Sequence, residues 1–244
     1  MEWAQGCPGH GWYARASGGA AARSRVSASA RLHAASAAPA ARQSGPGCAR
    51  SVQKKLRTRV EELRQEQPSL PVEVWAFDEQ RLGLKPVIRT VWARRGCRPI
   101  ARGHHRFQWL YVYGFVRPTT GAVVWFLADA ANTALFSAIL AAFATEVGAG
   151  PDKPVLLVID GAGWHVATDL QVPQGLELHV LPAHSPEIQP AECLWPLTRE
   201  AVANRHFETL DDLDDIVTRR CLTLAEDPDR IRAETLFHWW PAFT

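Results

Sequence analysis

The sequence lacks any apolar run long enough to cross a membrane, and it has few cysteines. Its longest apolar stretches are broken by charges, Gly or Pro well before the roughly 20 residues that a membrane-spanning helix needs. The chain of 244 residues has five cysteines, an odd number, far apart and never in a CxxC pair. This argues against a disulfide framework and against a zinc site. We therefore expect a chain that does not associate with membranes and that resides in a reducing cytoplasm.

Acidic residues are missing from residues 80–128, which contain nine basic residues. The net charge of the whole chain is only +2, and residues 61–244 carry more acidic than basic residues. Because phosphate binding depends on where the cations lie, this basic zone predicts a nucleic-acid contact. The alternative is a set of solvated surface hairpins. The predicted contact residues are Arg94, Arg95, Arg98, Arg102, His104, His105 and Arg106.

Residues 1–50 lack a sustained helical or strand period and have little large apolar surface. They are rich in Ala, Arg, Ser and Gly, a composition that cannot offset the entropy of ordering the chain. We expect a disordered basic segment. Two other interpretations stay open: an Arg- and Ser-rich transit peptide, or a stretch translated out of frame or from a misassigned start.

The remaining sequence predicts an α/β domain. Residues 51–66 are good helix formers and indicate a linker helix, within a linker spanning 51–70, and the folded domain covers residues 71–244. A meander of strands followed by strands that alternate with helices predicts a mixed five-stranded sheet flanked by helices. We expect strands at 72–77, 105–116, 122–128, 154–160 and 176–182, a small hairpin at 88–100, and helices at 132–147, 187–204 and 210–224.

Three acids lie where such a sheet places its functional groups. Asp78 and Asp160 each close a predicted strand, and Glu192 starts a helix that follows the last strand. Side chains at strand ends point into the crevice where α/β sheets bind ligands. Clustered carboxylates repel one another unless a cation neutralises them, and Mg²⁺ and Mn²⁺ prefer oxygen ligands. Taken singly, each acid is more simply a turn residue, a cap or a partner of the helix dipole.

Several motifs carry a family resemblance. The segments FDEQRLGL, LLVIDGAGWH and LPAHSPEIQPAECLWPL occur in this order, and 31 residues separate Asp160 from Glu192. Over roughly residues 70–240 the chain resembles the DDE transposases of bacterial insertion sequences, most closely the insertion sequence 630 family within the mariner superfamily. The resemblance implies a ribonuclease H-like fold and metal-dependent cleavage and strand transfer of DNA.

Carried over by position, the resemblance makes Asp78, Asp160 and Glu192 the catalytic, metal-binding acids. Two Mg²⁺ or Mn²⁺ ions would activate a nucleophilic oxygen and stabilise the leaving oxygen. We interpret Glu79 as a neighbour that supports these ligands, and His165 either as a partner of phosphate or metal-bound water or as a cap. The implied partners are transposon-end and target DNA and, on DNA, a second subunit. The implied location is a bacterial cytoplasm, on the nucleoid when DNA is bound.

One part of the family pattern is missing. Residues 1–50 contain no pair of periodic helices around a tight turn, so they do not predict a helix-turn-helix module for recognising element ends. This leaves two rival interpretations: a decayed transposase that binds DNA without catalysis, and another ribonuclease H-like nuclease such as a junction resolvase.

Overall fold

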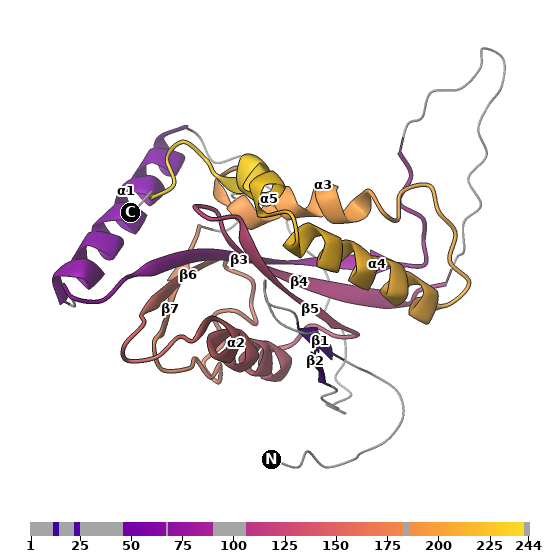
Figure 1. Ribbon diagram of the computed structural model, residues 1–244, viewed down its shortest axis with the longest axis horizontal. Helices are drawn as coiled ribbons and strands as arrows, with labels where there is room; N and C mark the ends of the chain where they lie inside the picture. The colour runs from indigo at the N-terminus through magenta and orange to yellow at the C-terminus, as the bar shows by residue number, and fades with distance from the viewer. Residues whose placement is uncertain are drawn as a thin grey trace.

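A sheet of five strands in the order β5-β4-β3-β6-β7 forms the centre of the fold (Figure 1). The computed structural model describes residues 12–14, 22–24, 46–66, 68–89, 106–182 and 186–241. The strands of the sheet are β3 (Glu73–Gly83), β4 (Trp109–Arg117), β5 (Ala122–Ala128), β6 (Val155–Ile159) and β7 (Leu176–Val180).

The central strand, β3, changes its main partner along its length. It pairs in parallel with β6 up to Ala76, which lies opposite Val158. From Ala76 to Gly83 it pairs antiparallel with β4. β4 and β5 are antiparallel, and β6 and β7 are parallel. The sheet is thus mixed, and its strand order is the ribonuclease H-like one, which confirms the predicted fold class.

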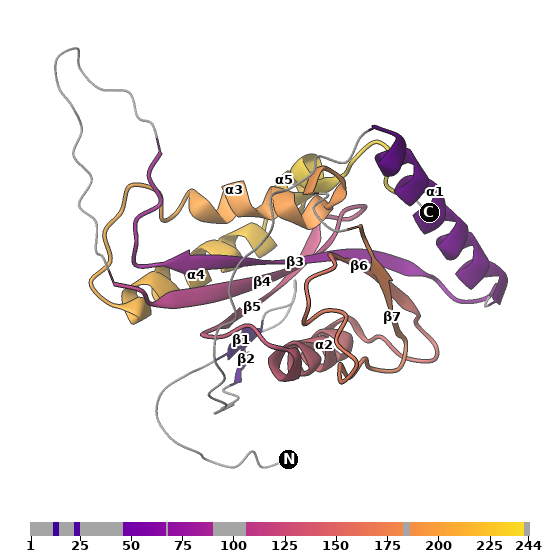
Figure 2. The same cartoon turned by 180° about the vertical axis from the view of Figure 1, so that it is seen from behind.

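Helices cover both faces of the sheet (Figures 1 and 2). α2 (Thr133–Val147) packs on one face, where its buried side chains join a cluster rich in Phe. α3 (Leu194–Arg199), α4 (Leu210–Ala225) and α5 (Pro228–Thr235) cover the other face and contribute to a second apolar cluster. Every residue of β6 is buried, as expected for a parallel strand covered on both sides.

The boundaries of α2 follow from local chemistry and match the prediction. The side chain of Asn132 accepts a hydrogen bond from the backbone N–H of Leu135 at 2.9 Å, which caps the first turn. Gly148 ends the helix in the left-handed conformation, with φ of 68°, a conformation that costs glycine little. β5, β6 and β7 likewise lie within the predicted ranges 122–128, 154–160 and 176–182.

The helix before the sheet, α1 (Pro46–Glu66), differs from the prediction. It begins at Pro46 rather than at residue 51, and it is not a free linker. Val52, Leu56 and Val60 form an apolar stripe that is buried in the same cluster as α3, α4 and α5. Arg59 also pairs with Glu177 of β7 at 2.6 Å. Within the first fifty residues, where we predicted no structure, two short strands pair antiparallel: β1 (Trp12–Ala14) and β2 (Ala22–Ser24).

The helix predicted for residues 187–204 is broken. Two short 3₁₀ helices, η1 (Pro186–Ile188) and η2 (Pro190–Cys193), precede the six residues of α3. The physical reason is proline: Pro186 and Pro190 can each start a helical turn, but neither can continue one that began earlier. Most of the predicted hairpin at 88–100 lies outside the described residues. In the parts of the chain that the structure describes, no helix is long and apolar enough to span a membrane.

Candidate active site

Asp78 and Asp160 occupy equivalent positions on neighbouring strands. The parallel pairing of β3 with β6 ends where Ala76 lies opposite Val158, and each acid follows two residues later. Asp160 comes directly after β6, as predicted. Asp78 does not close its strand, however, because β3 continues to Gly83 by pairing with β4. The site therefore lies where β6 leaves the sheet and β3 continues.

Glu192 reaches this place from η2, on the face covered by α3. The close packing of this segment depends on Gly114 of β4, which lies opposite Asp78. A Cβ atom on Gly114 would lie 3.0 Å from Leu194 Cδ1 and 3.1 Å from Trp195 Cη2. A side chain at this position would require Leu194 and Trp195 to shift by a few tenths of an ångström. The indole N–H of Trp195 then donates a 2.7 Å hydrogen bond to Asp78 Oδ2.

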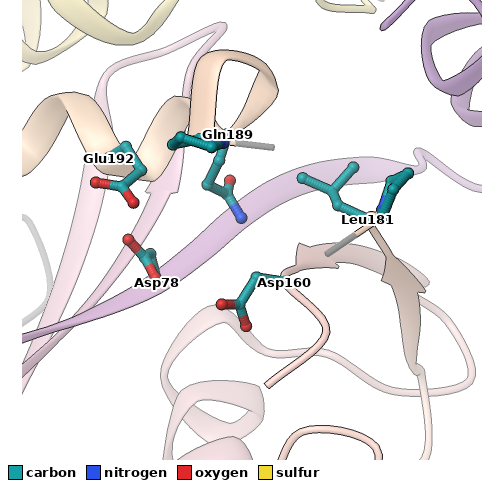
Figure 3. Close-up of a pocket in the computed structure, with 7 residues that line it drawn as sticks. Asp78, Asp160, Leu181, Gln189 and Glu192 are labelled. Carbon is teal, nitrogen blue, oxygen red and sulfur yellow. The ribbon is translucent and has the colours of Figure 1, made fainter. Parts of the chain in front are cut away.

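One cavity of about 260 Å³ joins the three acids (Figure 3). Figure 3 shows Asp78 and Glu192 facing each other across it, with Asp160 on the neighbouring side and Gln189 above. The cavity is lined by Asp78, Asp160, Leu181, Pro182, Pro186, Gln189 and Glu192. The fold thus brings the three acids of the sequence prediction together at one cavity.

The two facing acids hold their protons unusually tightly. Burial, then the charges of Glu192, Glu79 and Asp160, raise the pKa of Asp78 to about 8, although the Trp195 hydrogen bond opposes the shift. Burial also raises the pKa of Glu192, together with the charge of Asp160, while Arg199 and a hydrogen bond with Asp78 act in the opposite sense. In both residues burial is the main cause of the raised pKa, and neighbouring negative charge adds to it.

Asp160 has such a compensating partner in His165. The ring Nδ1 of His165 lies 2.5 Å from Asp160 Oδ1, and its Nε2 forms an ion pair with Glu79 Oε2 at 2.9 Å. The ring is buried against Phe77 and Phe136. Burial alone would lower the pKa of His165, but the two acids raise it to about 9. Although burial alone would raise it, the pKa of Asp160 falls because of the hydrogen bond and charge of His165.

Each acid of the cavity therefore has a different neighbour. Asp78 pairs with Glu192, whereas Asp160 pairs with His165. Among the residues that the structure describes, no three His, Cys, Asp or Glu side chains are arranged as ligands of a single metal ion. The chemistry of the donors nevertheless fits hard divalent cations, since the cavity offers carboxylate and amide oxygens and no sulfur.

The predicted DNA contacts lie mostly outside the part of the chain that the structure describes. Arg94, Arg95, Arg98, Arg102, His104 and His105 lie outside the described residues, and Arg106 is exposed at their edge. Elsewhere in the basic zone, Arg81 is exposed and stacks over the Trp109 ring at 4.2 Å. Arg117 instead pairs with Glu73 at 2.9 Å, and Glu73 also pairs with Lys153 at 3.1 Å.

Two residues at the site, Gln189 and Trp195, were missed by the sequence prediction. They flank Glu192 at intervals of three residues. Gln189 caps η2 and Glu192 lies within it, and three residues per turn place the two on one face, whereas Trp195 lies in α3. The predicted continuous α-helix from residue 187 gave no reason to single out either Gln189 or Trp195.

The fold and site together define a ribonuclease H-like α/β domain with an acidic cavity at the end of its parallel strands. A family model described as "DDE superfamily endonuclease" matches residues 73–214, more than half of the chain. The chain belongs to this family.

Uncharacterized protein y4pE/y4sA of Sinorhizobium fredii (strain NBRC 101917 / NGR234) is 34% identical over 136 residues, covering 54% of this chain and 97% of the relative.

Among solved structures, the Mos1 mariner paired-end complex with Mg gives a TM-score of 0.49 at 16% identity, covering 85% of this chain and 68% of that one. The Mos1 catalytic domain gives 0.43 at 12% identity, covering 81% and 98%. In the Mos1 paired-end complex with the left transposon end, this chain covers 66% of the length of its counterpart. These overall likenesses are weak, so the assignment rests on the family model.

Proposed function

We propose that this chain is the catalytic domain of a transposase of the insertion sequence 630 type, which cleaves DNA strands and joins them to a target. The observation that carries the proposal is the convergence of Asp78, Asp160 and Glu192 on one cavity in a DDE-family fold. Membership of the family supports DNA cleavage as the reaction, and the cavity is the proposed position of the active site.

Asp78, Asp160 and Glu192 would hold two Mg²⁺ or Mn²⁺ ions. When bound, such ions activate an attacking oxygen and stabilise the leaving oxygen of a phosphoryl transfer. Burial is the main cause of the raised pKa values of Asp78 and Glu192, and neighbouring negative charge adds to it. A bound cation would offset both effects and favour the ionised carboxylates. Trp195 would hold the Asp78 carboxylate in place, and His165 would do so for Asp160.

The proposed substrate is duplex DNA at the ends of a mobile element, followed by target DNA. The basic zone at residues 80–128 would contact the phosphates, since backbone contacts of this kind position a protein on DNA without reading its sequence. Joining two element ends would require two subunits on the DNA. The proposed place of action is the bacterial cytoplasm, on the nucleoid when DNA is bound.

The proposal is tested with the full chain and a labelled duplex carrying the inverted repeats that flank its gene. We expect strand cleavage that requires Mg²⁺ or Mn²⁺ and is abolished in Asp160→Asn. Asp215→Asn is a matched control, because it makes the same carboxylate-to-amide change at an exposed residue of α4 that does not line the cavity.

Two results would contradict the proposal. Cleavage that survives Asp160→Asn would remove the assignment of the metal site. A salt-dependent shift of DNA without cleavage in either metal would favour the decayed, non-catalytic protein instead.

A further inference from the structure

Asn204 holds the segment that follows β3 against the segment that follows α3. Its backbone N–H donates a 2.8 Å hydrogen bond to the carbonyl of Val87. Its side chain binds the backbone of Arg89 twice: Oδ1 accepts from the N–H at 2.9 Å, and Nδ2 donates to the carbonyl at 3.0 Å. Figures 1 and 2 show the two segments side by side, joined by the bridge between Val87 and Ala203. One residue therefore fixes the backbone at Arg89.

Asn204 makes these bonds in the left-handed conformation, with φ of 57°. Within the described ranges it is the one residue other than glycine with a positive φ. Asparagine enters this region more readily than most residues, because its short side chain can hydrogen-bond to nearby backbone. A backbone of this kind persists where its surroundings require it, and it often marks a functional segment. The constraint gives an exposed arginine a defined position.

The side chain of Arg89 turns back toward α3. Its Nη2 donates a 3.1 Å hydrogen bond to the carbonyl of Pro196. Pro196 follows Trp195, whose indole binds Asp78. A carbonyl is neutral, so this bond orients the exposed guanidinium without neutralising its charge, and it uses only part of the guanidinium's set of donors.

The two segments carry further exposed cations. We define the basic patch as Lys85, Arg89, Arg199 and Arg205, which are all exposed. Within the described ranges, none of the four forms an ion pair with a carboxylate. The one acid in residues 84–89 and 194–207 is Glu200, which pairs instead with arginines of α4 and α5. The patch is therefore a local excess of positive charge on the surface.

The basic patch and the acid cavity are connected through α3. Pro196, which binds Arg89, lies about one helical turn after Glu192. The charge of Arg199 also opposes the rise in the pKa of Glu192, so this cation acts on the cavity. DNA carries a negative charge at every nucleotide. A strand that is cut in the cavity thus presents its neighbouring phosphates to cations placed along α3.

We propose that the basic patch binds backbone phosphates of the DNA strand that enters the acid cavity, and that Asn204 holds Arg89 in place for this contact. The inference rests on the proposed function, and it adds Arg199 and Arg205, which lie outside the basic zone at residues 80–128. Guanidinium groups suit this role because their planar fork matches the oxygens of a phosphate. Such contacts position a protein on DNA without reading its sequence.

The experiment measures binding of the full chain to a labelled DNA duplex by fluorescence anisotropy, in EDTA and at several NaCl concentrations. Each lost phosphate contact reduces the slope of log K against log [NaCl] by about 0.9. We expect this reduction in Arg89→Gln, together with weaker binding to duplexes of every sequence. Arg89→Lys keeps the charge and should keep the slope. Thermal melts of each variant in EDTA check that the fold is retained.

Arg219→Gln is the matched control. Arg219 is an exposed arginine of α4, outside the basic patch, and it also donates a 3.1 Å hydrogen bond to a backbone carbonyl, that of Asp215. Its loss should leave the slope unchanged. Asn204→Gly tests the contribution of Asn204, because glycine keeps the left-handed backbone at little cost but removes both side-chain bonds to Arg89. It should weaken DNA binding although every cation remains.

The outcomes separate this inference from the proposed function. An unchanged slope in Arg89→Gln would overturn the inference, while cleavage by the wild type in Mg²⁺ or Mn²⁺ would still support the proposed function. Equal reductions in Arg89→Gln and Arg219→Gln would also overturn it, because any exposed arginine would then act alike. Wild-type binding in Asn204→Gly would remove Asn204 from it. A reduced slope in Arg89→Gln, without cleavage by the wild type, would support the DNA contact and contradict the proposed catalysis.

Discussion

Replacing Asp78 by asparagine should stabilise the metal-free protein, and the gain should grow with pH. The substitution keeps the shape and leaves an oxygen that can accept the hydrogen bond from Trp195. It removes a carboxyl group that is only 8% exposed and whose pKa is raised to about 8. The native state therefore holds a proton on Asp78 over a pH range in which the unfolded chain has released it.

The sign and size follow from this difference in proton binding. Between the ordinary pKa of 3.8 and about 8, the folded chain binds more protons than the unfolded chain, so wild-type stability falls as pH rises. One full proton changes the free energy of unfolding by about 1.4 kcal/mol per pH unit. The window from pH 4.5 to 6.5 avoids His165, whose raised pKa adds a stabilising contribution that is lost only above 6.5. Over these two units, the advantage of Asp78→Asn should grow by about 2.6 kcal/mol.

The assay is urea denaturation followed by tryptophan fluorescence in EDTA, at pH 4.5, 5.5 and 6.5, for the wild type and Asp78→Asn. Subtracting the two curves cancels the titration of surface carboxyls, which both proteins share. A constant difference across the three pH values would refute the reasoning, because it would mean that Asp78 is ionised throughout in the folded protein.

Three further predictions follow from the fold and the site. Mn²⁺ at 100 times its dissociation constant should stabilise the wild type by about 2.7 kcal/mol in urea denaturation at pH 8. The same Mn²⁺ concentration should stabilise it less at pH 5, because protons compete with the metal for Asp78 and Glu192. Equal stabilisation at both pH values would contradict this competition between protons and Mn²⁺. Gly114→Ala should lower the free energy of unfolding by about 1–3 kcal/mol in urea denaturation, because the added Cβ contacts Leu194 and Trp195. DNA cleavage should fall as well. An unchanged free energy of unfolding would mean that α3 has room to shift. Asn132→Ala should cost about 1 kcal/mol through its lost cap on α2 and leave Mn²⁺ affinity unchanged by calorimetry, so a change in affinity would show unexpected coupling to the site.

The parts of the fold that sequence predicted well are those encoded locally. β6 is a continuous apolar run, which predicts a strand covered on both faces, and Asp160 follows it directly. α2 has its cap at Asn132 and its stop at Gly148 within the helix sequence itself. Such signals depend on neighbours in the chain, so they can be read without knowing the fold.

The parts that sequence missed depend on distant partners. β3 continues past Asp78 because β4 pairs with it, and the polar residues there do not predict a strand. The approach of Glu192 depends on Gly114, nearly eighty residues earlier in the chain. Gln189 contacts the backbone of Phe77, and no local pattern encodes that bond. The sequence analysis therefore proposed the acids with Glu79 and His165 beside them, but it missed Trp195 and Gln189, whose contacts form only in the fold.

The end of the parallel ladder between β3 and β6 also determines where this chain can tolerate inserted residues. Side chains on a strand alternate between faces, so one extra residue between Glu73 and Asp78 would turn the acid away from Glu192 and toward α2. The connection between β6 and β7 forms no strand after His165, so an added residue there does not turn a site residue to the other face of the sheet. Such a loop can lengthen at small entropic cost. Natural variation in length among relatives should therefore be absent from β3 before Asp78 and concentrated after His165.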